Sequence, residues 1–301
     1  MAMPKSVRIV DVGPRDGLQS ELCTVPTDVK IELIQRLANA GIPAVEAGAL
    51  VSPKWVPQMA DSEVVLNAIE RRPGTVYPVL VPNMKGFERA QTANVTEIAL
   101  FSAVSETFSQ KNTNCSITES LDRATPVAAA GLAAGMRVRG YISCTLGCPY
   151  EGDIDATKVA DLAGKLLAMG CYEISLGDTI GVGTAAQAAT MVQAVAGEVP
   201  MAQLGLHFHD TYGQALANIL ACLELGVRTV DCAVAGLGGC PYAPGASGNV
   251  ATEDVLYMLD GLGIETGVDF AAVVAAGQYI CEAIGRVPTS KAAQAFLAKA
   301  A

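Results

Sequence analysis

The chain has 301 residues, of which 51% are hydrophobic, and a formal net charge of −10 at pH 7. This length and apolar content are sufficient for one large core, so we expect a single domain over residues 1–301. An acidic chain argues against nucleic acid or an anionic membrane as a partner, and no apolar run approaches the ~20 residues of a membrane-spanning helix. Few residues precede the first expected strand, which leaves no room for a targeting peptide and predicts a cytoplasmic protein.

Apolar, β-branched segments alternate along the chain with segments of helical periodicity. We expect strands at residues 7–13, 44–50, 75–82, 97–104, 137–144, 171–179, 204–211 and 229–236. The helical segments between them are residues 28–40, 62–71, 86–94, 120–134, 156–169, 185–197 and 213–225. Several of these helices stop at a glycine that precedes a strand, as at Gly41, Gly170 and Gly226, which is typical of helix C-caps.

Strand–helix units that recur at roughly thirty residues predict an α/β fold, a single (β/α)8 TIM barrel. Residues 250–262 and 270–284 then form additional C-terminal helices. An open doubly wound sheet is the competing arrangement. The barrel is favoured because the strand count reaches eight and polar residues stand at many strand ends. Both folds place their ligands at the carboxyl ends of the strands.

The only two histidines of the chain are His207 and His209, and they lie in an expected strand. Side chains alternate along a strand, so both imidazoles point to the same face. Two packed histidines satisfied by hydrogen bonds are the alternative. A pair on one face, in a chain with no other histidine, favours metal ligation. With carboxylate or amide co-ligands such a pair suits Mg, Mn or Zn.

Arg15 and Asp16 follow the first expected strand in a turn that contains Pro14. Proline stiffens this turn, and Gly13 and Gly17 are expected to adopt backbone angles closed to other residues. We therefore expect both charged side chains to be held in place. A surface ion pair is the alternative.

Two carboxylates lie inside expected strands, Glu46 and Asp178. A carboxylate inside a barrel needs a partner, and Arg15 or a metal would serve. Structural ion pairing is the alternative to a catalytic role. For Glu46 the structural interpretation is nearly as well supported as the catalytic one.

Residues 235–249 contain five glycines and two prolines and form neither helix nor strand. A long loop at the mouth of a barrel is typical of a lid. It lacks the pattern of a nucleotide-binding loop. Cys240 and Asn249 are its residues of reactive type.

Five segments of the chain match one known family: residues 12–19, 52–59, 143–152, 177–183 and 236–249, with GLGGCPYA at 236–243 the most specific. In these segments the chain resembles the 3-hydroxy-3-methylglutaryl-CoA (HMG-CoA) lyases, metal-dependent enzymes with a (β/α)8 barrel. The resemblance implies cleavage of HMG-CoA to acetyl-CoA and acetoacetate. It further implies a small-molecule acyl-CoA substrate and a homodimer.

Residue by residue, the resemblance implies that a divalent cation, Mg2+ or Mn2+, is bound by Asp16, His207, His209 and Asn249. Arg15 would stabilise the thioester enolate, and Cys240 would take part in proton transfer. Asp178 and Glu46 would support acid–base chemistry and substrate placement, and His207 belongs to the catalytic set as well as to the metal ligands.

One segment departs from the family. Where its members commonly have Thr-Ser-Phe, this chain has Gly48, Ala49 and Leu50. A hydroxyl and an aromatic ring are thus expected to be lost from a strand end that faces the substrate. A substrate with another acyl group is therefore an alternative, such as citramalyl-CoA or a longer branched 3-hydroxyglutaryl-CoA. An acetyl-CoA-condensing synthase and a metal-dependent hydrolase are weaker alternatives.

Overall fold

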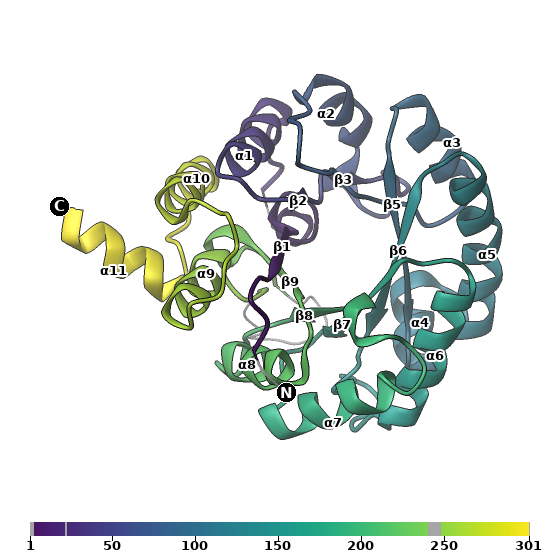
Figure 1. The fold of residues 1–301 in the computed structure, drawn as a ribbon. Coiled ribbons are helices and arrows are strands. Elements are labelled where there is room, and N and C mark those ends of the chain that lie inside the picture. Colours follow the sequence, from purple (N-terminus) through teal and green to yellow (C-terminus); the bar gives the residue numbers. More distant parts are fainter. Residues whose placement is uncertain (1–2, 22, 240–247, 301) are drawn as a thin grey trace.

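A closed barrel of parallel strands forms the centre of the molecule (Figure 1). The computed structural model describes residues 3–21, 23–239 and 248–300. Its strands are β1 (Arg8–Asp11), β2 (Ala44–Val45), β3 (Gly48–Ala49), β4 (Val79–Leu80), β5 (Glu97–Ala103), β6 (Arg137–Ser143), β7 (Glu173–Asp178), β8 (Leu204–Phe208) and β9 (Thr229–Cys232). Their order in the sheet is β2-β1-β9-β8-β7-β6-β5-β4-β3.

The two ends of this order are parts of one barrel strand. β2 pairs with β1 and β3 pairs with β4, while Glu46 and Ala47 separate them. The amide of Glu46 donates to Asp11 O and that of Ala47 to Pro78 O, so main-chain pairing continues across the break. Counted this way, the described strands fill the eight positions of a (β/α)8 barrel, which confirms the predicted fold.

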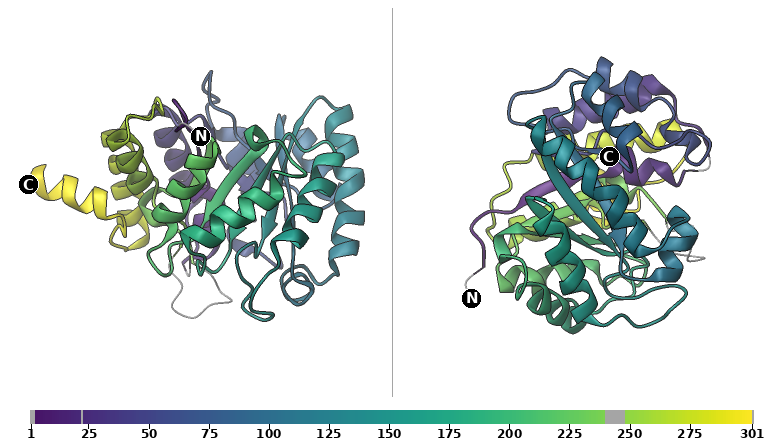
Figure 2. Two further views of the ribbon diagram at one scale, coloured as in Figure 1. Left: turned by 60° about the horizontal axis from the view of Figure 1, so that its bottom comes forward. Right: turned by 90° about the vertical axis from the view of Figure 1, so that its right-hand side faces the viewer.

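Helices surround the barrel on its outer side (Figure 1). They are α1 (Thr27–Asn39), α2 (Ser62–Ala68), α3 (Met84–Thr92), α4 (Glu106–Thr113), α5 (Ile117–Ala133), α6 (Ala156–Ala168), α7 (Ala185–Val195), α8 (Ala215–Leu225), α9 (Thr252–Gly261), α10 (Phe270–Ile284) and α11 (Lys291–Ala300). The sequence patterns did not predict α4 and α11. Figure 2 shows that α11 extends away from the barrel.

The expected helix ends are confirmed. Gly41, Gly170 and Gly226 have φ of 89°, 95° and 105°, a left-handed conformation that glycine adopts without the steric cost of a Cβ. In this way each helix returns to the next strand within a few residues.

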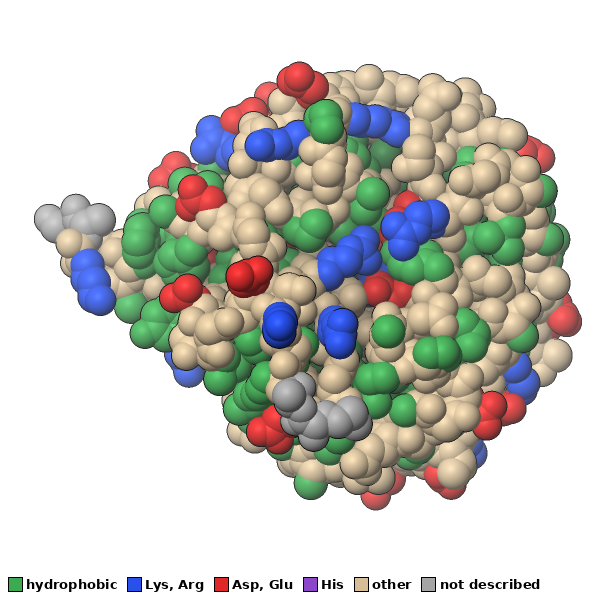
Figure 3. Space-filling view, in the orientation of Figure 1, with side chains coloured by type: hydrophobic (Ala, Val, Ile, Leu, Met, Phe, Trp, Pro, Cys, Tyr) green, Lys and Arg blue, Asp and Glu red, His purple; other side chains and the backbone are tan. Residues whose placement is uncertain are grey.

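The strands consist almost wholly of buried residues, as expected of parallel strands covered by helices. On the face of the molecule in Figure 3, Lys and Arg side chains gather near the centre, and neither histidine is visible. Among the described residues, no helix combines the length and apolar character needed to cross a membrane.

Candidate active site and metal centre

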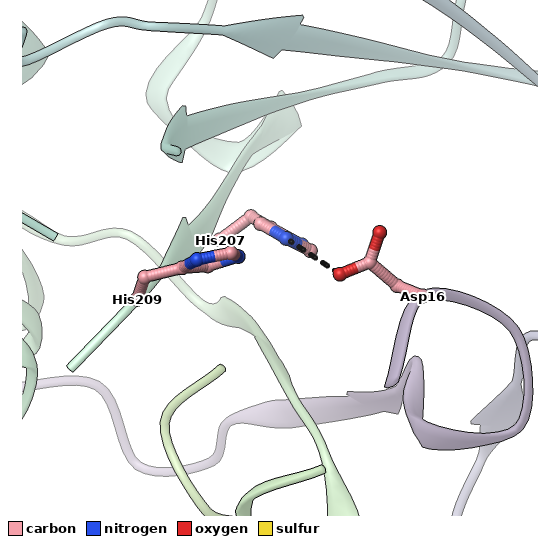
Figure 4. Close-up of side chains that lie close together, drawn as sticks. All are labelled: Asp16, His207 and His209. Atoms are coloured by element: carbon pink, nitrogen blue, oxygen red, sulfur yellow. Dashed lines mark ion pairs between the residues drawn. The ribbon is translucent and has the colours of Figure 1, made fainter. Parts of the chain in front are cut away.

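His207 and His209 lie at the carboxyl end of β8, with relative exposures of 9% and 6%. Their ring centroids are 5.7 Å apart, and both rings point toward the turn after β1 (Figure 4). Phe208, between them, is fully buried. The prediction that both imidazoles share one face is therefore confirmed.

Asp16 lies in the turn that faces the histidines, Gly13–Gly17, which forms one turn of π-helix directly after β1. The expected unusual angles at Gly13 and Gly17 are wrong, because neither residue has a positive φ. Both glycines serve close approach instead. A Cβ on Gly13 would lie 2.8 Å from Asp11 Oδ1, and one on Gly17 would lie 2.7 Å from Leu237 Cβ.

Asp16, His207 and His209 each offer one ligand atom within 4.8 Å of the others. Asp16 Oδ2 is 3.7 Å from His207 Nε2 (Figure 4) and accepts a hydrogen bond of 2.9 Å from Asn249 Nδ2. Asn249 is also bridged through its backbone to His209. One carboxylate, two imidazoles and an adjacent amide form a donor set that fits a divalent cation.

The electrostatics of these side chains favour ligation. Burial opposes ionisation of Asp16, but the charge of Arg15, followed by the neighbouring His207, outweighs it and holds its pKa well below the usual value. Burial, followed by the neighbouring His207, lowers the pKa of His209 to about 4. At neutral pH Asp16 is therefore an anion and His209 a neutral imidazole, the states that bind metals.

Arg15 lies against the same cluster. Its Nε and Nη2 both lie 2.7 Å from Glu46 Oε2, and its Nη1 donates to Asp16 Oδ1 at 2.7 Å. Arg15 is 7% exposed and Glu46 is fully buried. Burial raises the pKa of Glu46, although the charge of Arg15 opposes that rise. Of the two partners expected for Glu46, Arg15 or a metal, the structure shows Arg15.

Asp178 has a different environment. Its carboxylate accepts hydrogen bonds from the amides of Val182, at 3.2 Å, and Gly183, at 2.8 Å, and so fixes the loop after β7. The amide of His209 reaches the backbone oxygen of Asp178 at 3.3 Å. A part for its side chain in acid–base chemistry stays a prediction. Cys240 lies outside the described residues.

Three buried polar residues next to the site were missed by the sequence reasoning: Tyr141, Arg139 and Asp231. Tyr141 meets the edge of His207 at 5.8 Å between ring centroids, and the Arg15 guanidinium lies 5.8 Å from the centre of its ring. Asp231 lies 3.3 Å from His207 Nδ1. Glu46 was identified because it is a charged residue within an expected strand. Arg139 and Asp231 are also charged residues within expected strands, so the same criterion could have identified them.

Position 48 does not face the site. A Cβ on Gly48 would lie 2.8 Å from Oγ and 3.0 Å from Cβ of Ser62, on helix α2. A hydroxyl at position 48 would therefore face α2, and the expected loss of a hydroxyl from the substrate side stays a prediction for position 49. Ala49, the next residue along β3, is on the opposite face by strand alternation.

Comparison with known proteins adds evidence from outside the chain. The family model described as HMGL-like matches residues 6–280. The chain belongs to the HMGL-like family. It is 60% identical to the mitochondrial hydroxymethylglutaryl-CoA lyase of Mus musculus over 97% of this chain and 90% of that protein. It is 58% identical, over the full length of both chains, to a Pseudomonas aeruginosa protein named 3-hydroxy-3-isohexenylglutaryl-CoA/hydroxy-methylglutaryl-CoA lyase.

A solved structure gives the same result for the fold. The chain superposes with a TM-score of 0.93 on an HMG-CoA lyase of Acinetobacter baumannii in complex with coenzyme A and 3-methylmalate. The two are 38% identical, and the match covers 98% of this chain and 96% of the other. The HMGL-like assignment thus agrees with the barrel and with the lyase resemblance of the sequence.

Proposed function

We propose that this chain is a divalent-cation-dependent carbon–carbon lyase that cleaves (S)-3-hydroxy-3-methylglutaryl-CoA to acetyl-CoA and acetoacetate. The observation that carries the proposal is the fixed guanidinium of Arg15 beside the Asp16, His207 and His209 cluster. The identity of about three residues in five to named HMG-CoA lyases supports it.

The cation is Mg2+ or Mn2+ in this proposal, with Asp16, His207, His209 and Asn249 as its ligands. When bound, it would supply Lewis acidity that orients the substrate's 3-hydroxyl and lowers its pKa. Asp16 and the two histidines present their donor atoms from β8 and from the turn after β1, so substrate and cation would meet at the carboxyl ends of the strands.

Arg15 has the central part in bond cleavage. When the C2–C3 bond of the acyl chain breaks, negative charge develops on the thioester oxygen of the departing enolate. A guanidinium held by Glu46 and Asp16 meets that charge without having to reorganise. Glu46 acts through Arg15, because Nε and Nη2 of the guanidinium both contact Oε2 of Glu46. Protonation of the enolate carbon is assigned to Cys240, and substrate placement to Asp178.

A related acyl group is the second candidate. The Pseudomonas relative is named for a longer branched 3-hydroxyglutaryl-CoA as well as for HMG-CoA. Ala49, where the family commonly has Ser, would leave more space for such an acyl chain, whereas alternation along the chain returns Leu50 to the face of Gly48. Citramalyl-CoA stays open on the same grounds. We further propose that the chain forms a homodimer and acts in the cytoplasm.

A cleavage assay tests the proposal directly. The purified protein, supplied with Mg2+ or Mn2+, is given HMG-CoA, citramalyl-CoA and an isohexenyl-substituted substrate side by side, and the keto product is identified. Acetoacetate at the highest kcat/KM supports the leading proposal. Another preferred product keeps the mechanism and changes the substrate, whereas no cleavage of any of them overturns the proposed reaction.

A further inference from the structure

His207 is in contact with a second carboxylate that belongs to no predicted site. Asp231 lies on β9 directly beside His207, its register partner on β8. Its Oδ2 is 3.3 Å from His207 Nδ1, on the side of the imidazole away from Nε2 and Asp16. The side chain of Asp231 has no exposed surface. The imidazole is thus held between two carboxylates from opposite ring edges.

Asp231 is itself fixed in orientation. Its Oδ1 accepts a hydrogen bond of 2.7 Å from Arg139 Nη2. Its Oδ2 accepts two hydrogen bonds, one of 3.0 Å from Nη1 of the same guanidinium and one of 2.7 Å from Ser175 Oγ. Arg139 is fully buried and also donates a hydrogen bond of 2.7 Å to Glu173. A two-pronged contact with a guanidinium leaves a carboxylate little freedom to rotate. The oxygen that faces His207 therefore has one defined position.

The barrel makes room for this arrangement. Gly205 lies two residues before His207 on β8, on the same face of the strand. A Cβ at Gly205 would lie 2.8 Å from Arg139 Nη2. Any larger residue at this position would push the guanidinium away from Asp231. The layer beneath His207 thus depends on a glycine that the helix and strand patterns do not explain.

The hydrogen-bond partners of Asp231 agree with a donor–acceptor contact. Its two oxygens accept hydrogen bonds from Nη1 and Nη2 of Arg139 and from Oγ of Ser175. A carboxylate paired in this way with a guanidinium acts as an acceptor toward His207 as well, so Nδ1 of His207 donates. In metal sites the ring nitrogen that does not bind the metal commonly donates to such a carboxylate, and this contact sets tautomer and ring orientation.

We propose that Asp231, fixed by Arg139, is the positioning residue for His207, and that it keeps Nε2 unprotonated and directed at the cation site. The inference rests on the metal centre of the proposed function and adds to it a residue that sets metal affinity. It assigns Arg139 and Gly205 a supporting part. Asp231 acts through His207 and is not a catalytic residue.

Imidazole NMR tests the inference on the unsubstituted chain, and a variant is needed only to assign the signals. Because the chain has two histidines, the 15N spectrum of the labelled, Mg2+-loaded protein contains two ring systems, and the His209→Gln variant assigns them. We expect the His207 proton on Nδ1 with Nε2 unprotonated. A proton on Nε2 would overturn the proposal, whatever the effect of any variant.

Metal affinity provides a second test, measured as the EPR signal of free Mn2+ during titration of the full chain. Asp231→Asn is expected to weaken Mn2+ binding about 10–100-fold. Thr229→Val is the matched control, because Thr229 is buried on the same face of the same strand but pairs with Gly205 and donates to Glu173. Its affinity should equal that of the parent. Equal affinity in Asp231→Asn, or equal weakening in both variants, would contradict the proposal.

Two further outcomes are informative. If Asp231→Asn does not fold, Ser175→Ala removes one hydrogen bond from the same carboxylate and should weaken Mn2+ binding by a smaller factor, while unchanged binding would count against the proposal. If the parent chain binds no Mn2+, the metal centre itself is refuted together with the inference. If the parent binds Mn2+ and the variants bind it equally well, only the positioning role fails.

Discussion

Arg15 and Glu46 come from neighbouring strand ends and form a salt bridge of 2.7 Å that is almost entirely out of solvent. Two nitrogens of the guanidinium contact one oxygen of the carboxylate. The other oxygen, Oε1, is buried and has no hydrogen-bond partner within the part of the chain that the structure describes. The carboxylate of Glu46 therefore serves to hold the guanidinium of Arg15 in place. This geometry leads to the first prediction.

Arg15→Gln should lower kcat far more than it raises KM, because the contact strengthens as charge develops in the transition state. Loss of one such donor elsewhere costs about 10²–10³ in kcat. Steady-state kinetics with HMG-CoA at saturating Mn2+ measure the effect. Arg8→Gln is the control, since Arg8 lies at the other end of β1 and contacts Glu173. A kcat equal to that of the parent would refute the role of Arg15.

Metal binding should stabilise the folded chain, because the three ligands converge only in the native barrel. At a free Mn2+ concentration 100-fold above its Kd, the gain is about 2.7 kcal/mol. For a domain of 301 residues that corresponds to a rise in Tm of about 4 °C. The rise should disappear in His207→Ala, together with metal-dependent turnover. Differential scanning fluorimetry measures it, and an equal rise in parent and variant would exclude His207 as a ligand.

The sequence was sufficient to predict the barrel because its strands are buried on both faces and its helices end at glycines with positive φ. It was less informative where a strand is held by few main-chain bonds. The expected strand at residues 75–82 is reduced to Val79–Leu80, and Pro78 and Pro82 on either side cannot donate to the ladder. Helix α11 was missed because it packs against the other C-terminal helices and not against the barrel.

The metal cluster could be predicted because His207 and His209 are unmistakable in a chain with no other histidine. The layer below them could not be assembled from the sequence, although its charged residues were visible in the expected strands. That Asp231 contacts both His207 and Arg139 depends on strand register. A one-residue shift of register would move each of these side chains to the other face.

Substitutions at positions 48 and 49 should separate packing from specificity. Gly48→Thr places atoms against Ser62 of α2, and overpacking of this kind costs about 1–3 kcal/mol of stability. It should leave the preference among acyl-CoA substrates unchanged. Ala49→Ser should instead preserve stability and shift the ratio of kcat/KM between HMG-CoA and the isohexenyl substrate by about 2–10-fold, the value of one hydrogen bond. Urea unfolding measures stability, and paired kinetics measure the substrate preference. A shift in preference for Gly48→Thr together with a loss of stability for Ala49→Ser would contradict the orientation of β3.

The stability of the chain should decrease as pH rises through neutrality, owing to two buried acids that have no cationic partner among the described residues. Burial raises the pKa of Asp11 to about 7 and that of Glu253 to about 8. Asp11 accepts hydrogen bonds from Gly13 N and Thr252 Oγ1, and Glu253 accepts from Ala235 N. In the unfolded chain both carboxyls ionise at their ordinary, lower pKa values.

Between about pH 4 and pH 8 the folded chain therefore holds protons that the unfolded chain has lost, so the contribution of these acids is complete below pH 4 and is lost as pH rises through 7 and 8. Asp11→Asn keeps the shape and removes one titration. Relative to the parent, the variant should gain up to roughly 4 kcal/mol in unfolding free energy between pH 4 and pH 8. Asp155→Asn, at the exposed N-cap of α6, is the control, because hydrogen bonds from Thr157 lower the pKa of Asp155, the direction opposite to the shift of Asp11. Urea unfolding across pH measures the difference, and parallel curves for parent and Asp11→Asn would show that Asp11 is ionised in the folded chain.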